Sequence, residues 1–422
     1  MTLIAKTDSI AHAKTTSVSD TKQPTNAVTT TPPRSLLSAF LDAYPGLSPD
    51  IVVRAPGRAN LLGGHVDMHG GPVINIAINR DIWLAAAYGT PELVQLHAPD
   101  LGGRSAMFSL TSLNERKDIV GDGLPNWALY PAGVAWALQR RGLKVSGINA
   151  AFLGDVPMRA GLSSSAAVEE TFAIAWQALG NWRLDGGDLA TVGTEAEREY
   201  IGVGSGIQDQ FTCLHARKSH VLWLDCRTLD YRHTPLPSSV NIVICDTNTR
   251  RELTSSGYTR RAQDGHAAAH TIRLVDPRIQ TLRDVSPEQL AEFEALLTPN
   301  QYRRARHVIS EIARVDQGRN VLEQGDLAAF GRLMNESYRS ARDDYGSSSV
   351  ALDAMWTAAT QHEGCYGARY SGGGEAGVIV ALVAADAVED FMTCTAARYE
   401  RASGCAGSLY VVEPAESAGV YI

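Results

Sequence analysis

Residues 154–170 read GDVPMRAGLSSSAAVEE, a turn led by glycine and proline, then three consecutive serines and an apolar helix. The first backbone N–H groups of a helix have no partner within it, and the helix dipole adds positive partial charge there. Small residues at that end let oxygen atoms approach the chain closely, so this order of residues predicts a phosphate-binding loop. An ordinary capped helix is the alternative. The segment is not a P-loop, because no GxxxxGK[ST] lysine follows the glycines.

The helix that follows the serines has one apolar face. That face carries Val168, Phe172, Trp176 and Leu179 at helical spacing. The pattern predicts that the serine loop (residues 161–167) rests on a buried helix.

The composition limits the class of protein. With 422 residues, 44% hydrophobic and 20% charged, the chain is large enough for two globular domains. A net charge of -8 argues against nucleic acid as a partner. No apolar run reaches the ~18 residues of a membrane span, so we expect no membrane partner. The six cysteines are widely spaced without a CxxC pair, which favours a reduced, cytoplasmic chain.

The order of patterns along the chain predicts an α+β fold in two domains. Residues 1–34 are rich in Thr, Ser, Lys and Ala and lack the apolar core of a secretory signal, so we expect a disordered tail. Strands and helices then interleave, which predicts one domain over residues 35–230 and a second over 231–422. The expected strands are 51–53, 73–78, 145–153, 220–225, 240–245, 378–383 and 408–412, and the expected helices are 188–200, 305–323, 327–342 and 388–402.

Three glycine-rich segments occur in a fixed order: APGRANLLGGHVDMHGG (55–71), the serine loop, and YSGGGEAG (370–377). Together they resemble the GHMP kinases, and the segments GIQDQF (206–211) and DTNTRRELTSSGYTRR (246–261) are similar to the galactokinase branch. The resemblance implies ATP-dependent phosphorylation of the anomeric (C1) hydroxyl of galactose or a galactose-configured sugar. It also implies a ribosomal-protein-S5-type N-terminal domain and a ferredoxin-like C-terminal domain.

The resemblance implies catalytic roles for two residues. Asp209 matches the family's proposed base, which abstracts a proton or orients the sugar hydroxyl, and Arg58 matches the arginine that pairs with it. A plain buried ion pair is the alternative. The phosphate loop would comprise Gly161, Ser163, Ser164, Ser165 and Ala166.

The same resemblance implies a magnesium site and an adenine pocket. Ser165 and Glu197 match the family's pair of Mg²⁺ ligands, a hydroxyl and a carboxylate. The alternative is that Glu197 faces solvent beside Glu195 and Glu199 on an acidic helix. Trp127 and Tyr130 match the aromatic pair of the adenine pocket, although the sequence alone favours core aromatics.

On the sugar side, the residues that match the family's site are Gly64, His65, Asp67, Gly206 and Tyr258. The segment GGHVDM departs from the family's GEHTDY, because Gly64 replaces a glutamate that faces C6 of the sugar. The change removes a negative charge and an acceptor and predicts open space at that end. Galacturonate, arabinose and fucose therefore join galactose as candidate acceptors.

Two further departures lie beside the phosphate loop. Arg159 stands where the family favours glycine, and it either adds positive charge at the nucleotide or lies outward on a turn. Glu375 replaces a usual Phe, and a carboxylate there would repel phosphates unless it is paired or turned away. A non-catalytic sugar-sensing regulator is the alternative from another class. The intact serine loop, Arg58, Glu197 and Asp209 favour the enzyme. The sequence does not decide between monomer and dimer.

Overall fold

The computed structural model describes residues 31–250 and 256–421. Of the predicted tail, residues 1–30 lie outside the described residues, and helix α1 (Arg34–Ala43) begins where the tail was expected to end. Residues 251–255, inside the 246–261 motif, also lie outside them. In the described ranges, no helix combines the length and apolarity that a membrane crossing requires.

The larger of two sheets forms around a long antiparallel pair. Strand β1 (Ile51–Leu62) contains the start of the first glycine-rich segment, strand β2 (Pro72–Tyr88) follows that segment, and the two strands pair over most of the length of β1. The sheet order is β12-β1-β2-β5-β3-β4, and β6 pairs with both β2 and β7. The remaining strands are β3 (Leu93–Ala98), β4 (Arg104–Ser109), β5 (Ile148–Gly154), β6 (His220–Asp225), β7 (Tyr231–Pro235) and β12 (Gly419–Val420).

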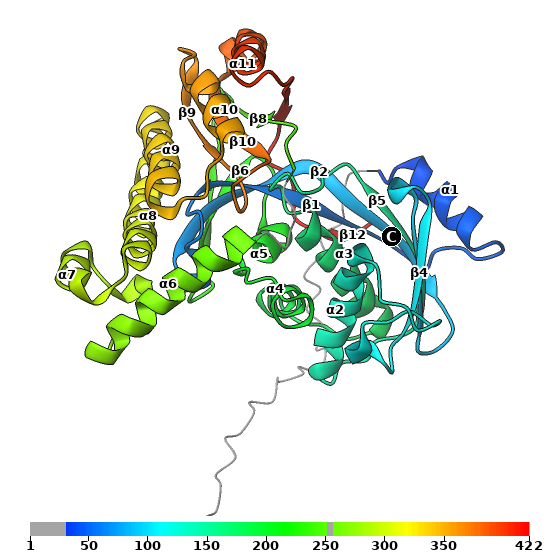
Figure 1. Ribbon diagram of the computed structural model, residues 1–422. Coiled ribbons are helices and arrows are strands. Elements are labelled where there is room, and N and C mark those ends of the chain that lie inside the picture. Colours follow the sequence, from blue (N-terminus) through cyan, green and yellow to red (C-terminus); the bar gives the residue numbers. More distant parts are fainter. Residues whose placement is uncertain (1–30, 251–255, 422) are drawn as a thin grey trace, which may run out of the picture.

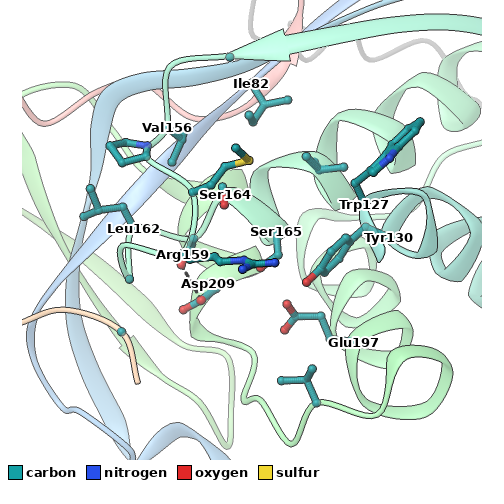
Figure 2. Close-up of a pocket in the computed structure, with 18 of the residues that line it drawn as sticks. Ile82, Trp127, Tyr130, Val156, Arg159, Leu162, Ser164, Ser165, Glu197 and Asp209 are labelled. Atoms are coloured by element: carbon teal, nitrogen blue, oxygen red, sulfur yellow. Dashed lines mark hydrogen bonds between the residues drawn. The ribbon is translucent and has the colours of Figure 1, made fainter. Parts of the chain in front are cut away.

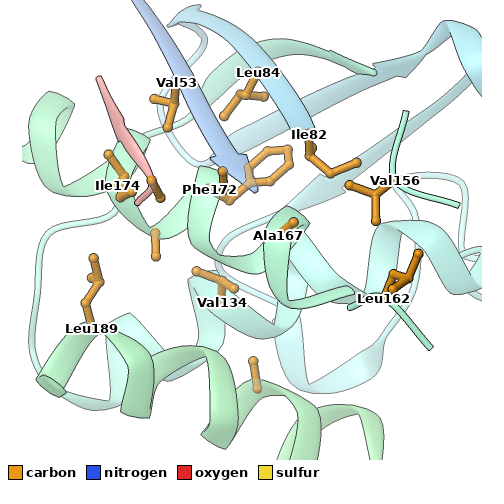
Figure 3. Packing of buried hydrophobic residues seen from close by; sticks show 14 of the residues in the cluster. Val53, Ile82, Leu84, Val134, Val156, Leu162, Ala167, Phe172, Ile174 and Leu189 are labelled. Atoms are coloured by element: carbon orange, nitrogen blue, oxygen red, sulfur yellow. The ribbon is translucent and has the colours of Figure 1, made fainter. Parts of the chain in front are cut away.

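Helices gather on one face of this sheet (Figure 1): α2 (Asn126–Arg140), α3 (Ser164–Gly180), α4 (Gly186–Glu195) and α5 (Gln208–His215). The helix after the serines is buried as predicted, since Phe172 and Trp176 of α3 are fully buried. Figure 3 shows Phe172 of α3 beside Ile82 and Leu84 of β2, all within one buried cluster. Burial of this apolar face fixes the position of the serine loop relative to the sheet.

The smaller sheet is antiparallel, with the order β11-β8-β10-β9, and all its strands come from the half of the chain predicted to form the C-terminal domain. Its strands are β8 (Val240–Asp246), β9 (Cys365–Tyr370), β10 (Val378–Ala384) and β11 (Ser408–Val412). Helices α10 (Val350–Thr360) and α11 (Val388–Ser403) pack on it through a buried cluster around Phe391 and Tyr399. The other helices are α6 (Ser256–Val275), α7 (Pro287–Glu292), α8 (Pro299–Glu323) and α9 (Leu327–Ser340).

The expected elements all occur, with shifts at their ends. The helix expected over 188–200 is α4 followed by a wider π-helical turn, η4 (Ala196–Ile201). The strand expected over 51–53 is only the start of β1. The domain division at residue 230 stays a prediction. Strand β7, just after it, pairs with β6 of the larger sheet, and β12 returns to pair with β1.

Candidate active site

One cavity of about 970 Å³ lies beside the serine loop, and most of the predicted site residues line it. Its size is typical of a site for small molecules. The predicted residues that line it are Arg58, His65, Asp67, Trp127, Tyr130, Gly161, Ser163, Ser164, Ser165, Glu197, Gly206, Asp209 and Tyr258. Two do not line it. Ala166 is fully buried on α3, and Gly64 is buried but is not among the lining residues.

The serine loop is not an ordinary helix cap. Ser163 has a left-handed backbone, with a φ of 59°, and makes no side-chain hydrogen bond to α3. An N-cap serine normally has an extended backbone and accepts a bond from the first turn. The hydroxyl of Ser163 instead donates to Asp209 Oδ2 at 2.5 Å. Ser164 and Ser165 then begin α3 at the cavity wall, so the N-terminal end of the helix faces the cavity (Figure 2).

Arg58 connects Asp209 to this loop. A register shift between Pro56 and Arg58 interrupts the pairing of β1 with β2, and the Arg58 N–H donates to Leu162 O at 3.0 Å. The guanidinium contacts Asp209 Oδ1 through Nε at 2.7 Å and Nη2 at 2.6 Å. Its Nη1 donates to Gly161 O at 2.8 Å. The predicted pairing of Arg58 with Asp209 is therefore present in the structure. Arg58 is hydrogen-bonded to the serine loop through its backbone N–H and its guanidinium, and Asp209 through the hydroxyl of Ser163.

The third glycine-rich segment packs against the serine loop. Gly161 has a φ of 87°, and a β-carbon there would lie 2.3 Å from Ser371 O. A β-carbon on Gly372 would lie 2.6 Å from Gly161 Cα, so both positions require glycine. Ser371 Oγ donates to Gly161 O at 2.9 Å. We did not predict a role for Ser371, although it lies inside the YSGGG segment.

Glu197 points into the cavity and not to solvent. It is 6% exposed and lies on η4, where Figure 2 shows its carboxylate near Tyr130 and Ser165. Burial raises its pKa, as does the charge of Asp209, while the Ser165 hydroxyl lowers it in part. Its neighbour Glu199 instead pairs with Arg140 of α2, and Glu195 pairs with Arg141, the residue after that helix. The solvent-facing alternative for Glu197 is therefore wrong.

Four of the five residues predicted for the sugar line the same cavity: His65, Asp67, Gly206 and Tyr258. Asp67 is 8% exposed, and burial together with the charge of Asp209 raises its pKa to about 6. A β-carbon on Gly206 would lie 2.1 Å from Asp67 Oδ2, so the glycine makes room for the carboxylate. His65 stacks on Tyr345 with ring centroids 4.2 Å apart. We did not predict Gln208, which lines the cavity between Gly206 and Asp209 in the GIQDQF segment.

Three family sequence models match successive parts of the chain. The galactokinase galactose-binding signature matches residues 38–88, the GHMP kinase N-terminal domain 130–217 and the GHMP kinase C-terminal model 320–397. The chain is 41% identical over 374 residues to a galactokinase of Roseiflexus sp. (strain RS-1), covering 89% of this chain and 94% of the relative. The chain belongs to the galactokinase family. A galactokinase of Chloroflexus aggregans is 36% identical and covers 88% of this chain and 93% of its own.

Solved structures support the same assignment. Lactococcus lactis galactokinase, complexed with galactose, matches with a TM-score of 0.84 and 30% identity, covering 90% of this chain and 98% of its own. Methanococcus jannaschii mevalonate kinase matches with a TM-score of 0.58 at 14% identity, which shows the shared fold alone. As a galactokinase family member, the chain is a sugar kinase with the two-domain GHMP fold.

The departure from the galactokinase pattern at Gly64 does not leave open space. A β-carbon there would lie 2.2 Å from Arg369 Nη2, so the Arg369 guanidinium fills that volume. Its Nη1 donates to Glu311 Oε1 at 3.3 Å, and the same oxygen accepts from the N–H groups of Gly63 and Gly64. Burial alone would raise the pKa of Glu311, but Arg314 and Arg369 lower it to about 2. The predicted opening at the C6 end is therefore wrong.

The other two departures from the galactokinase pattern are resolved differently. Arg159, at a φ of 58°, lines the cavity, and Figure 2 shows its side chain extending past Ser165 toward Tyr130. Its charge thus lies at the predicted nucleotide end. Glu375 is paired, because its Oε1 lies 2.6 Å from Arg261 Nη1.

Proposed function

We propose that this protein transfers the γ-phosphoryl group of ATP to the C1 hydroxyl of galactose and releases galactose 1-phosphate and ADP. The observation that carries the proposal is the contact of Asp209 with both Arg58 and Ser163, within one cavity. Phosphoryl transfer requires an aligned hydroxyl next to donors that stabilise charge on the phosphate. The carboxylate and the serine loop supply these two parts side by side.

Each group of the chain has a role in this reaction. Asp209 accepts a hydrogen bond from the C1 hydroxyl, orients its oxygen and takes up its proton as the phosphate bond forms. Arg58 holds Asp209 in place and adds positive charge close to the phosphate. The first turn of α3 directs N–H groups at the phosphates, and Trp127 and Tyr130 line the wall where the adenine would bind.

Ser165 and Glu197 fit a magnesium site. A hydroxyl and a buried carboxylate line the same part of the cavity, and hard oxygen ligands of this kind suit Mg²⁺, which keeps several waters. When bound, the cation would neutralise charge on the phosphates. The buried position of Glu197 supports this role, since a carboxylate without a counter-charge is costly there.

Galactose is the acceptor that we favour. The relatives and the structural neighbour are named galactokinases, and the expected gap at Gly64 is filled by Arg369. The filled space disfavours the acceptors that depended on an opening at C6, arabinose and fucose, and the names of the relatives disfavour galacturonate. Asp67 accepts hydrogen bonds from ring hydroxyls, with His65, Gly206 and Tyr258 around it. The cytoplasmic location stays a prediction.

Release of ADP on adding galactose to the protein with ATP and Mg²⁺ tests the proposal, with Asp209→Asn as the matched control. We expect turnover in the wild type and a loss of about 10²- to 10⁴-fold in kcat in the variant. Galactose binding by calorimetry without any turnover would instead identify a sugar-sensing regulator. A parallel series with galacturonate, arabinose and fucose tests the acceptor, and a faster rate with any of them would overturn the choice of galactose.

A further inference from the structure

Glu375 lies in the glycine-rich turn between β9 and β10, where it is a non-glycine residue with a left-handed backbone. Its backbone has a φ of 66°, and its N–H donates to Ser347 O at 2.8 Å. The flanking residues Gly374 and Ala376 line the cavity. The Glu375 side chain lies along the start of α6, because a β-carbon on Gly257 would lie 2.2 Å from its Oε1. A residue of the phosphate-side turn therefore contacts the helix on the sugar side.

The partner of Glu375 is a buried arginine on α6. Arg261 is 5% exposed, and its Nη1 donates both to Glu375 Oε1 at 2.6 Å and to Gly346 O at 3.2 Å. The guanidiniums of Arg261 and Arg304 both lie about 6 Å from the ring of Tyr345. The Nε of Arg304 lies 3.9 Å from Asp264 Oδ2, so this carboxylate is the counter-charge of Arg304. Glu375 is the counter-charge of Arg261. A buried guanidinium depends strongly on such a partner.

Arg261 lies one helical turn after the predicted sugar residue Tyr258. Residues three apart share a face of a helix, and both lie in the first two turns of α6, which begins at Ser256. Tyr258 lines the cavity, and its ring lies 5.9 Å from His65. The first turn of a helix has the fewest internal hydrogen bonds, so contacts outside the helix decide how firmly it is held.

We propose that Glu375 is a positioning residue for sugar binding: through Arg261 it holds the first turn of α6, and with it Tyr258, against the glycine-rich turn that packs on the serine loop. The proposal rests on the proposed function, since it assigns the sugar end of that same cavity. It implies that a charge on the nucleotide-side turn determines how well the enzyme binds galactose. The phenylalanine of the family pattern cannot provide this charge.

Steady-state kinetics of Glu375→Gln test the proposal, because this change removes the charge and keeps the shape. We expect KM for galactose to rise roughly 5- to 20-fold, with KM for ATP within twofold and kcat within threefold. Asp276→Asn is the matched control, since it breaks an exposed arginine pair just beyond the other end of α6 and should change neither constant. Arg261→Gln should raise KM for galactose similarly, and the double variant should be no worse than either single one.

Equal rises in KM for galactose and ATP would overturn the proposal, because they would indicate collapse of the glycine-rich turn. So would additive losses in the double variant. Hydrogen exchange of the amides at the start of α6 provides a readout that does not depend on turnover. We expect faster exchange there in Glu375→Gln, with Asp276→Asn unchanged. Wild-type protein that does not phosphorylate galactose would refute the proposed function, whereas unchanged exchange in Glu375→Gln would refute the role of Glu375.

Discussion

Glu170→Met should stabilise the protein, although it replaces a charged residue beside the predicted phosphate loop. Glu170 is fully buried on α3, and neither carboxyl oxygen has a hydrogen-bond partner among the described residues. Burial raises the pKa of Glu170 well above its ordinary value, which favours the protonated form in the folded state. Methionine has a similar length and no polar atom to leave unpaired. Removing an unpaired buried carboxyl should add about 1–3 kcal/mol to the free energy of unfolding at pH 5.

The gain should grow with pH. A group whose pKa is raised on folding stabilises the folded state fully only below its unfolded pKa, here the ordinary value of 4.5. Above it, the unfolded chain loses the proton that the folded chain keeps, at a cost of up to about 1.4 kcal/mol per pH unit. Between pH 5 and pH 7 the advantage of Glu170→Met over wild type should therefore increase.

Urea unfolding at the two pH values, followed by tryptophan fluorescence, measures this difference, and Trp176 lies on the same helix. The matched control is Glu169→Met. Glu169 is equally buried, but its Oε2 accepts from Gln210 Nε2 at 2.8 Å, so its loss should destabilise by about 1–3 kcal/mol. If Glu170→Met proves destabilising, or if its effect does not depend on pH, a partner of the Glu170 carboxyl stabilises the folded state.

Four other outcomes follow from the site. The value of kcat/KM for galactose should fall as pH drops below about 6, because Asp67, whose pKa is raised to about 6, becomes protonated there. A flat pH profile of kcat/KM down to pH 5 would contradict this. Gly161→Ala should abolish phosphorylation and lower Tm, because at a φ of 87° the β-carbon of the alanine would collide with Ser371 O. Unchanged kinetics would show that the serine loop and the YSGGG segment can move apart to accommodate it. Glu197→Gln should raise the Mg²⁺ concentration for half-maximal rate at least tenfold in a titration at fixed ATP, if this carboxylate is a ligand. Ser163→Ala should lower kcat less than tenfold, whereas Asp209→Asn should lose at least a hundredfold; equal losses would make the serine hydroxyl as important as the carboxylate.

Much of the site could be predicted because its residues lie in short segments with distinctive spacing. The GLSSS segment indicated a loop before a helix, and α3 begins at Ser164. The GIQDQF segment contains Asp209 and also Gln208, whose uncharged amide gives no comparable indication of a role in the site. The pairing of Arg58 with Asp209 was expected from the family pattern and not from separation in the chain, since the two residues are 151 positions apart.

The incorrect expectations concern space and contacts between distant segments. Gly64 suggested an empty pocket because a sequence shows the lost side chain and not the neighbour that takes its place. That neighbour, Arg369, comes from β9, more than 300 residues later, and is held by Glu311 of α8. The pairing of Glu375 with Arg261 also joins segments that are far apart in the sequence. Tertiary packing of this kind has no local signature.

The hydrogen bonds of Asp209 restrict how it acts on a sugar hydroxyl. A carboxylate offers about four lone-pair positions, and Arg58 occupies Oδ1 through two N–H groups while Ser163 occupies one position on Oδ2. The Asp209 side chain is 21% exposed against 4% for Arg58, so its open side faces the cavity. One position on Oδ2 is then left for the sugar, beside the Ser163 hydroxyl. In the reaction that we propose, the carboxylate would therefore direct the C1 oxygen toward the serine loop before it takes up the proton.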